Sequence, residues 1–300
     1  MRLSLALVLV FPALAVAQPA AAQKQATVKW VLGCEAPDGG FYLAPQDPKS
    51  DAKPQPMLRA TNGAVRALKY LGAEVPNKEK HAAFVLKCYD PKTGAFAEPG
   101  GKPDVTITSV GVMAAAELGI PHEKYATAMD YLKDNAKTFE EVRIAAAAVE
   151  AWGLKTYPHD LKPWFKIASE LFSKEFGDAR DGGARDVGSV AAMLVRLGVT
   201  PPPADAAVLV GQMRDGQRDD GGWGKKGETA SDIETTYRVM RALMLLKEKP
   251  KDAKKLREFL DAHRNKDGGY ATKPGDPSSM SGVYYCVIVS KWLDDMEAKK

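Results

Sequence analysis

A short glycine motif recurs through the chain and constrains its fold more than any other feature. Its five copies are residues 38–41 (DGGF), 93–96 (TGAF), 181–184 (DGGA), 220–223 (DGGW) and 267–270 (DGGY). The second small residue recurs after 55, 88, 39 and 47 residues. The longest step is about twice an ordinary one, so we expect a copy without glycines near residues 137–141. Repeats of this length are typical of stacked or ring-shaped architectures.

Each copy of the motif separates two kinds of predicted helix. The stretch before the glycines is amphipathic, as in residues 82–88 and 253–263. Glycine then ends that helix because it tolerates the left-handed conformation. The stretch after the loop is small and apolar, as in residues 109–118 and 189–197, and residues 142–153 have the same character. No sustained alternation typical of strands is present, so the fold class is all-α.

The two kinds of helix predict a ring. The second helix of each unit is apolar on nearly every side and must be buried on every side, whereas the first carries Lys and Glu on one face. An outer ring of first helices around an inner ring of second helices satisfies both. We therefore expect six hairpins that close into an α/α toroid, as a single domain over residues 23–300. An open solenoid is the alternative, disfavoured because neither terminal unit has an evident polar cap.

The first 22 residues have the features of a secretory signal peptide. Arg2 supplies a positive charge, and residues 3–16 are apolar but broken by Pro12, too short to span a bilayer. Residues 15–17 and 20–22 both offer the small side chains that a signal peptidase reads. We expect a secreted or periplasmic protein with no stable membrane span after cleavage of residues 1–22. An uncleaved anchor is the alternative.

The chain has three cysteines, Cys34, Cys88 and Cys286. An odd number leaves at least one thiol free or paired between molecules. Cys34 and Cys88 occupy matching places in adjacent repeats, so a disulfide between them is one interpretation. Buried, inert thiols are the favoured one.

The tryptophan copy of the motif resembles a known family. Residues 217–223 (QRDDGGW) resemble the QW motif of squalene and oxidosqualene cyclases, and the recurring Asp-Gly-Gly-aromatic is similar to repeats of protein prenyltransferase β subunits. The whole mature chain resembles one toroid of this prenyltransferase/squalene-oxidase repeat superfamily. The resemblance implies that the motifs are structural, with Phe41, Phe96, Trp223 and Tyr270 filling gaps between hairpins. The fold also hosts complement-type thioester domains, so it does not settle function.

Prenyltransferase β subunits hold a catalytic zinc with Asp, Cys and His, and only part of that set is present. In the matching stretch, residues 227–237, Asp232 fits the Asp and Glu234 stands where the Cys is expected. Residues 281–284, where the His is expected, contain none, and His263 is on an outer helix. We therefore expect no metal and no cofactor. A weaker alternative is a divalent-ion site at Asp232 and Glu234, although an N-cap role for Asp232 is favoured.

Other catalytic motifs are absent from the sequence. Class II cyclases protonate their substrate through Asp-x-Asp-Asp, but Gln217 and Trp292 stand where the first Asp is needed before the pairs at 219–220 and 294–295. Neither the thioester GCGEQ sequence nor a Gly-x-Ser-x-Gly or phosphate-binding loop occurs, and no two histidines have helical metal-ligand spacing. We expect the catalytic motifs of the family to be lost.

Polar residues at the starts of the inner helices are the candidates for a ligand site. Matching the helix ends places Thr61, Thr108 and Thr236 at equivalent sites. We expect a charged rim and a tyrosine wall below it, with these binding candidates: Arg59, Asp104, Glu141, Arg143, Asp186, Asp232, Glu234, Tyr237, Arg238, Tyr284 and Tyr285, with Arg185 nearby. Helix caps and ion pairs explain the same residues without a ligand, and this interpretation is favoured.

Three functions remain open. The first is an exported toroid that binds an apolar or isoprenoid-like small molecule, or a protein partner, in its central cavity. The second is a prenyltransferase-like transferase with a rebuilt active site, disfavoured by export because prenyl diphosphate donors are cytoplasmic. The third is an α/α-toroid carbohydrate-active enzyme with two carboxylates at the mouth. The net charge of +4 without a run of five like charges indicates no nucleic-acid partner.

Overall fold

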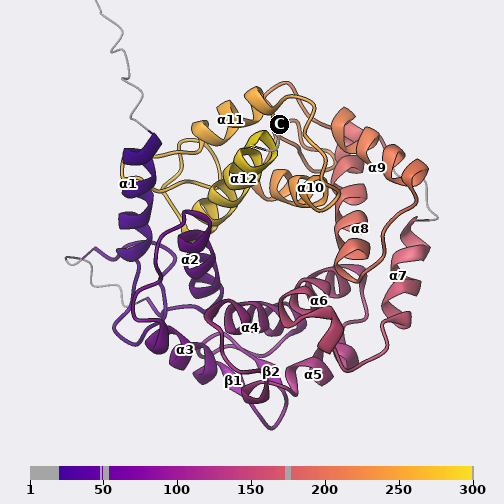
Figure 1. Ribbon diagram of the computed structural model, residues 1–300. Coiled ribbons are helices and arrows are strands. Elements are labelled where there is room, and N and C mark those ends of the chain that lie inside the picture. The colour runs from indigo at the N-terminus through magenta and orange to yellow at the C-terminus, as the bar shows by residue number, and fades with distance from the viewer. Residues whose placement is uncertain (1–19, 48, 50–53, 173–176, 299–300) are drawn as a thin grey trace, which may run out of the picture.

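The computed structural model describes residues 20–47, 49, 54–172 and 177–298. All but the last three residues of the predicted signal peptide lie outside this part. The described residues form twelve α-helices, which alternate between an outer and an inner ring (Figure 1). The outer helices are α1 (Ala20–Leu32), α3 (Lys78–Lys87), α5 (Ala128–Asn135), α7 (Lys162–Phe172), α9 (Pro203–Asp215) and α11 (Ala253–Ala262). The inner helices are α2 (Leu58–Tyr70), α4 (Val105–Leu118), α6 (Phe139–Trp152), α8 (Ala184–Arg196), α10 (Ile233–Leu245) and α12 (Met280–Ala298).

The inner helices form a closed ring. Each packs against the next one along the chain, and α12 packs against α2 (Figure 1). The six-hairpin α/α toroid predicted from the repeats is therefore confirmed, and the open solenoid is wrong. The remaining regular elements are short: a two-stranded pairing of β1 (Tyr89–Asp90) with β2 (Ala95–Phe96), two 3-10 turns at His122–Lys124 and Leu154–Thr156, and a π-helical turn at Ala179–Gly183.

The motif glycines hold neighbouring units together by close backbone approach. Gly39, Gly221 and Gly268 have φ values of +92°, +92° and +89°. A Cβ at these positions would lie 2.4 Å from the carbonyl oxygen of Lys80, 2.2 Å from that of Lys255 and 2.7 Å from that of Ala26, respectively. In each case the neighbour belongs to the next outer helix, and for Gly268 that helix is α1. The last motif therefore closes the ring onto the first helix.

The motif aromatics are fastened to the inner helices by a repeated hydrogen bond. Phe41, Phe96 and Trp223 are buried, and their backbone N–H groups donate to the Oγ1 atoms of threonines at 3.0, 3.1 and 3.0 Å. The acceptors are Thr61, Thr108 and Thr236. Their predicted equivalence is confirmed, but these buried side chains bind the backbone rather than line a ligand site. Tyr270 is half-buried.

The copy without glycines lies where the spacing predicted it. Helix α5 ends at Asn135 and α6 begins at Phe139, so the connection is only three residues long. A capping box replaces the glycine turn: the Thr138 side chain accepts from the Glu141 N–H at 3.3 Å, and Glu141 Oε2 accepts from the Thr138 N–H at 2.8 Å. A connection this short leaves no room for the glycine loop of the other units.

The cysteines are not cross-linked. Cys34, Cys88 and Cys286 are all free thiols, so the disulfide interpretation for Cys34 and Cys88 is wrong. Cys34 and Cys286 are buried and Cys88 is half-buried, close to the favoured expectation. Burial raises the pKa of Cys34 and of Cys88 to about 12, which keeps both thiols protonated and unreactive at neutral pH.

None of the helices in the described part of the chain combines the length and the apolar character needed to cross a membrane.

Candidate functional site

A cavity of about 250 Å³ occupies the centre of the ring. All six inner helices line it, mostly through their first three turns, so it lies toward the end of the ring where these helices begin. Its apolar wall consists of Leu43, Ala60, Gly63, Val110, Met113, Ile144, Ala147, Ala192 and Met280. The remaining lining includes five arginines, one glutamate and three tyrosines: Arg59, Arg143, Arg196, Arg238, Arg241, Glu234, Tyr237, Tyr284 and Tyr285.

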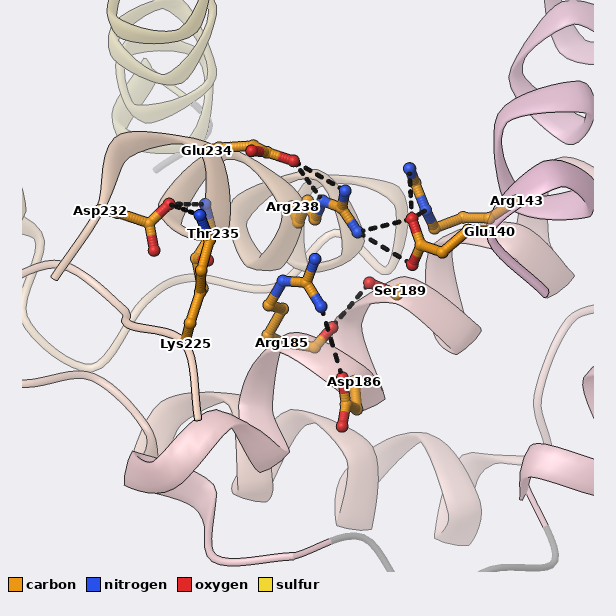
Figure 2. Close-up of polar contacts among 10 residues, drawn as sticks. All are labelled: Glu140, Arg143, Arg185, Asp186, Ser189, Lys225, Asp232, Glu234, Thr235 and Arg238. Carbon is orange, nitrogen blue, oxygen red and sulfur yellow. Dashed lines mark hydrogen bonds and ion pairs between the residues drawn. The ribbon is translucent and has the colours of Figure 1, made fainter. Parts of the chain in front are cut away.

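The charged rim contains a network built around Arg238 (Figure 2). Its guanidinium donates to Glu234 Oε1 at 2.7 Å from the same helix and to Glu140 at 3.1 Å from α6. Arg143 donates to the same Glu140 at 3.0 Å. Burial alone would raise the pKa values of Glu140 and Glu234, but the neighbouring arginines lower both below the ordinary range. Both carboxylates are therefore ionised at neutral pH.

The structure divides the eleven predicted site residues into two groups. Seven line the cavity: Arg59, Arg143, Glu234, Tyr237, Arg238, Tyr284 and Tyr285. The other four do not. Asp104 and Asp232 cap α4 and α10 by accepting from Ile107 N at 2.7 Å and Thr235 N at 2.9 Å. Glu141 belongs to the capping box, and Asp186 is exposed beside Arg185 at 3.8 Å (Figure 2).

The residues at the start of α10 do not fit a zinc ion. Asp232 accepts the helix N–H through Oδ1, which lies 3.8 Å from Lys225 Nζ, and Glu234 is held by Arg238. Asp232 Oδ2 is buried without a hydrogen-bond partner, but neither a thiolate nor an imidazole joins it. His263 Nδ1 lies 2.8 Å from the Phe259 carbonyl oxygen instead. Among the residues that the structure describes, no three His, Cys, Asp or Glu side chains come together as metal ligands do.

A second layer of arginines lies deeper in the ring, where the sequence analysis expected only a tyrosine wall. Arg66 on α2, Arg196 on α8 and Arg241 on α10 come from the later turns of their helices. Arg241 and Arg196 are only 5% and 8% exposed. The Arg241 guanidinium carbon lies 4.4 Å from the Trp292 ring centroid, and Nη2 donates to Tyr237 Oη at 3.2 Å. The available signal was a cation in the later, otherwise apolar turns of α8 and α10, where it has to be buried with its neighbours.

The deep arginines face a cluster of tyrosines. Tyr237 Oη lies 3.3 Å from Tyr284 Oη, and the Tyr237 ring stacks on Trp292 at 5.6 Å. Burial alone would raise the pKa of Tyr237, but Arg241, Arg196 and Arg66 together lower it to about 6. Burial raises the pKa of Tyr284 above its usual range. The interior of the ring is therefore strongly positive at this depth and not uniformly apolar.

The comparisons place this geometry in a family. The sequence profile of the prenyltransferase alpha-alpha toroid domain matches residues 5–157 and 190–300. The chain therefore belongs to the prenyltransferase alpha-alpha toroid family, as the motif resemblance predicted. A comparison with curated proteins found no match.

Solved structures share the fold at low sequence identity. The apo type II terpene cyclase MstE from Scytonema is 11% identical with a TM-score of 0.60, over 92% of this chain and 98% of that one. A variant of the same cyclase in complex with its substrate, geranylgeranyl dihydroxybenzoate, is 11% identical with a TM-score of 0.61, over 93% and 98%. A protein from Actinoplanes is 12% identical with a TM-score of 0.59, over 92% and 99%. At such identities the likeness concerns the fold.

Proposed function

We propose that this toroid binds an isoprenoid-like or other apolar small molecule in its central cavity. The observation that carries the proposal is the cavity itself, which all six inner helices surround and whose wall is apolar between the rim and the deep arginines. A cavity of about 150 Å³ accommodates benzene, so one of about 250 Å³ has room for roughly ten non-hydrogen atoms. This size favours a ligand of about two isoprene units, or one such portion of a longer molecule.

The similar structures support an isoprenoid over other apolar ligands. The cyclase MstE from Scytonema has been solved with geranylgeranyl dihydroxybenzoate and with merosterolic acid A. In this chain, Tyr237, Tyr284 and Tyr285 contribute aromatic faces to the cavity wall, against which branched alkenes pack well. A protein partner that inserts a side chain into the cavity would use the same wall and is the competing occupant.

We propose binding without the catalytic centres of the family, because no observation favours the two enzymatic alternatives. A zinc-dependent transferase would need metal ligands at the start of α10, and the residues described there do not form such a set. A glycosidase needs a carboxylic acid with a raised pKa next to its substrate, whereas the pKa of Glu234 in the cavity is lowered. Burial raises the pKa of Asp186, but this side chain is outside the cavity lining and 65% exposed.

Titration with geraniol tests the binding proposal. The purified protein should bind this ten-carbon alcohol with a measurable heat in calorimetry. Ala192→Phe places a bulky ring in the cavity and should abolish the binding, whereas Ala151→Phe, at an exposed position on α6, should leave it unchanged. Absence of binding to the wild type, or equal affinities of wild type and Ala192→Phe, would contradict a small-molecule function of the cavity.

We also propose that the chain is exported and that its first 22 residues are removed. A mature chain from residue 23 keeps Thr27 and Trp30, the side chains of α1 that meet the last motif, so cleavage leaves these ring contacts in place. N-terminal sequencing of the protein from fractionated cells tests this. We expect a start at residue 23 in the exported fraction, and an intact N-terminus in the cytoplasm would refute it.

A further inference from the structure

The deep arginine Arg241 has no carboxylate partner among the described residues, and its one acceptor is the Tyr237 hydroxyl oxygen. It is 5% exposed, and no carboxylate within the described ranges pairs with it. Its contacts are the Tyr237 hydroxyl and the faces of Trp292 and Tyr237, and its Nε is buried without any hydrogen-bond partner. An unused donor on a buried cation is costly because it has left water without gaining an acceptor.

The neighbouring carboxylates are already paired with other cations. Arg196 is paired with Glu150 at 3.0 Å, and Arg66 lies 3.9 Å from Glu117, which also pairs with Lys69. Arg66 Nε is likewise buried without an acceptor. Three arginines and a lysine thus share two carboxylates and the Tyr237 tyrosinate, so this layer still carries a net positive charge. The lowered pKa of Tyr237 reflects the same excess.

This layer is the floor of the cavity. Arg196 and Arg241 line the cavity from below the apolar wall, and Arg241 also borders a second pocket that opens at the far ends of α2, α4 and α6. Arg238, at the rim, lies three residues before Arg241 on the same face of α10. It is fully paired with Glu140 and Glu234. The rim arginine is therefore paired with two carboxylates, whereas the floor arginine pairs with no carboxylate of the described residues and keeps an unused Nε donor.

We propose that the floor of the cavity binds the anionic head of an amphipathic ligand, a carboxylate or a phosphate, through Arg241 and Arg196, while the apolar tail of the ligand points toward the rim. This inference rests on the proposed function and narrows it from an apolar ligand to one with a terminal anion. Arginine suits the role because its planar group donates two parallel hydrogen bonds to either anion.

Three ten-carbon probes with the same tail test the proposal: geraniol, geranic acid and geranyl monophosphate. We expect at least one of the two anions to bind about tenfold or more tightly than geraniol, because a charged hydrogen bond in a buried site is worth at least that ratio. Whichever of the two anions binds more tightly identifies the head group as a carboxylate or a phosphate. Equal affinities for all three would overturn the anion site and leave the proposed function intact, whereas failure of all three to bind would overturn both.

Substitutions locate the site. Arg241→Met should abolish the preference for the anion but retain geraniol binding, and Arg241→Lys should retain part of the preference because it keeps the charge and loses the planar fork. Arg257→Met removes a cation on outer helix α11, paired with Asp294 at 2.9 Å, and should leave the preference unchanged. Circular dichroism establishes that each variant is folded. If Arg241→Met does not fold, the Lys variant decides: an undiminished preference in either variant overturns the proposal.

Discussion

Replacing Gly268 by alanine should open the joint at which the ring closes, and Gly275 offers a matched control. Both glycines belong to the loop between α11 and α12 and have nearly the same backbone angle, with φ of +89° and +88°. They differ in surroundings. A Cβ at Gly268 would lie 2.7 Å from the Ala26 carbonyl oxygen of α1, whereas one at Gly275 would meet nothing within 4 Å.

The expected magnitudes follow from this difference. Gly275→Ala should lower the free energy of unfolding by about 1–2 kcal/mol, the cost of a left-handed alanine. Gly268→Ala has the same strain and also pushes the loop away from α1. That movement weakens two hydrogen bonds, from Thr27 Oγ1 to the Gly268 carbonyl at 2.8 Å and from Trp30 Nε1 to Asp267 Oδ2 at 3.0 Å. At about 1 kcal/mol each, the excess is about 2 kcal/mol.

Equilibrium unfolding in urea measures both variants side by side, and hydrogen exchange localises the effect. We expect faster exchange of the amides of α1 in Gly268→Ala and ordinary exchange there in Gly275→Ala, because only the first contact joins the two ends of the ring. Equal destabilisation of the two variants would refute the reasoning, since it would show that backbone strain explains everything and that the approach to α1 contributes nothing.

Three further predictions concern the fastening threonines, the rim and the floor. Thr236→Val leaves the buried Trp223 N–H without its acceptor and should lower the free energy of unfolding by about 1–3 kcal/mol in urea titrations, whereas Thr106→Val, at an exposed cavity position, should change it little. Arg238→Met releases Glu140 and Glu234, which are 51% and 38% exposed, so a smaller loss of about 1–2 kcal/mol is expected, with an upward shift of both carboxylate pKa values in NMR titration. Tyr237 has a pKa of about 6 in the folded protein and about 10 in the unfolded chain. Its contribution to the free energy of unfolding is therefore complete above pH 10 and is lost as the pH falls toward 6. The ionisable groups that face it are Arg66, Arg143, Arg196, Arg241, Tyr284 and Tyr285. Tyr237→Phe should flatten that slope and remove the tyrosinate absorbance that appears near neutral pH; a wild type without either signal would contradict the assigned pKa.

Most of the ring was predictable because glycine repeats report directly on backbone geometry. The positive φ of Gly39, Gly221 and Gly268 is available to few other residues, so the motif recurs wherever one loop meets the next helix. Even the unit without glycines was located by spacing, and its three-residue connection explains the missing motif. The alternative of a disulfide between Cys34 and Cys88 was wrong because matching positions in two repeats indicate equivalent environments and not proximity.

The site was less predictable because a sequence shows where a helix starts but does not show how deep in the ring a given side chain lies. Asp104 and Asp232 were named as both caps and rim residues, and only the structure shows that capping determines their orientation. Glu140, next to the predicted Glu141, was missed because one residue along a helix turns the side chain by about 100°. Arg196 and Arg241 were missed because the later turns of the inner helices were taken as uniformly apolar, and the cations there were not weighed.

The contact between Gly268 and α1 has a consequence for how the protein is made. Trp30 and its partner Asp267 are 237 residues apart, so almost the entire chain must leave the ribosome before this side of the first helix can form its contact. At about 5–20 residues per second, that delay lasts on the order of tens of seconds. During this time α1 can pack against α2 but lacks its contact with the last motif, so the edge of the first hairpin should be the part of the nascent chain most dependent on chaperones.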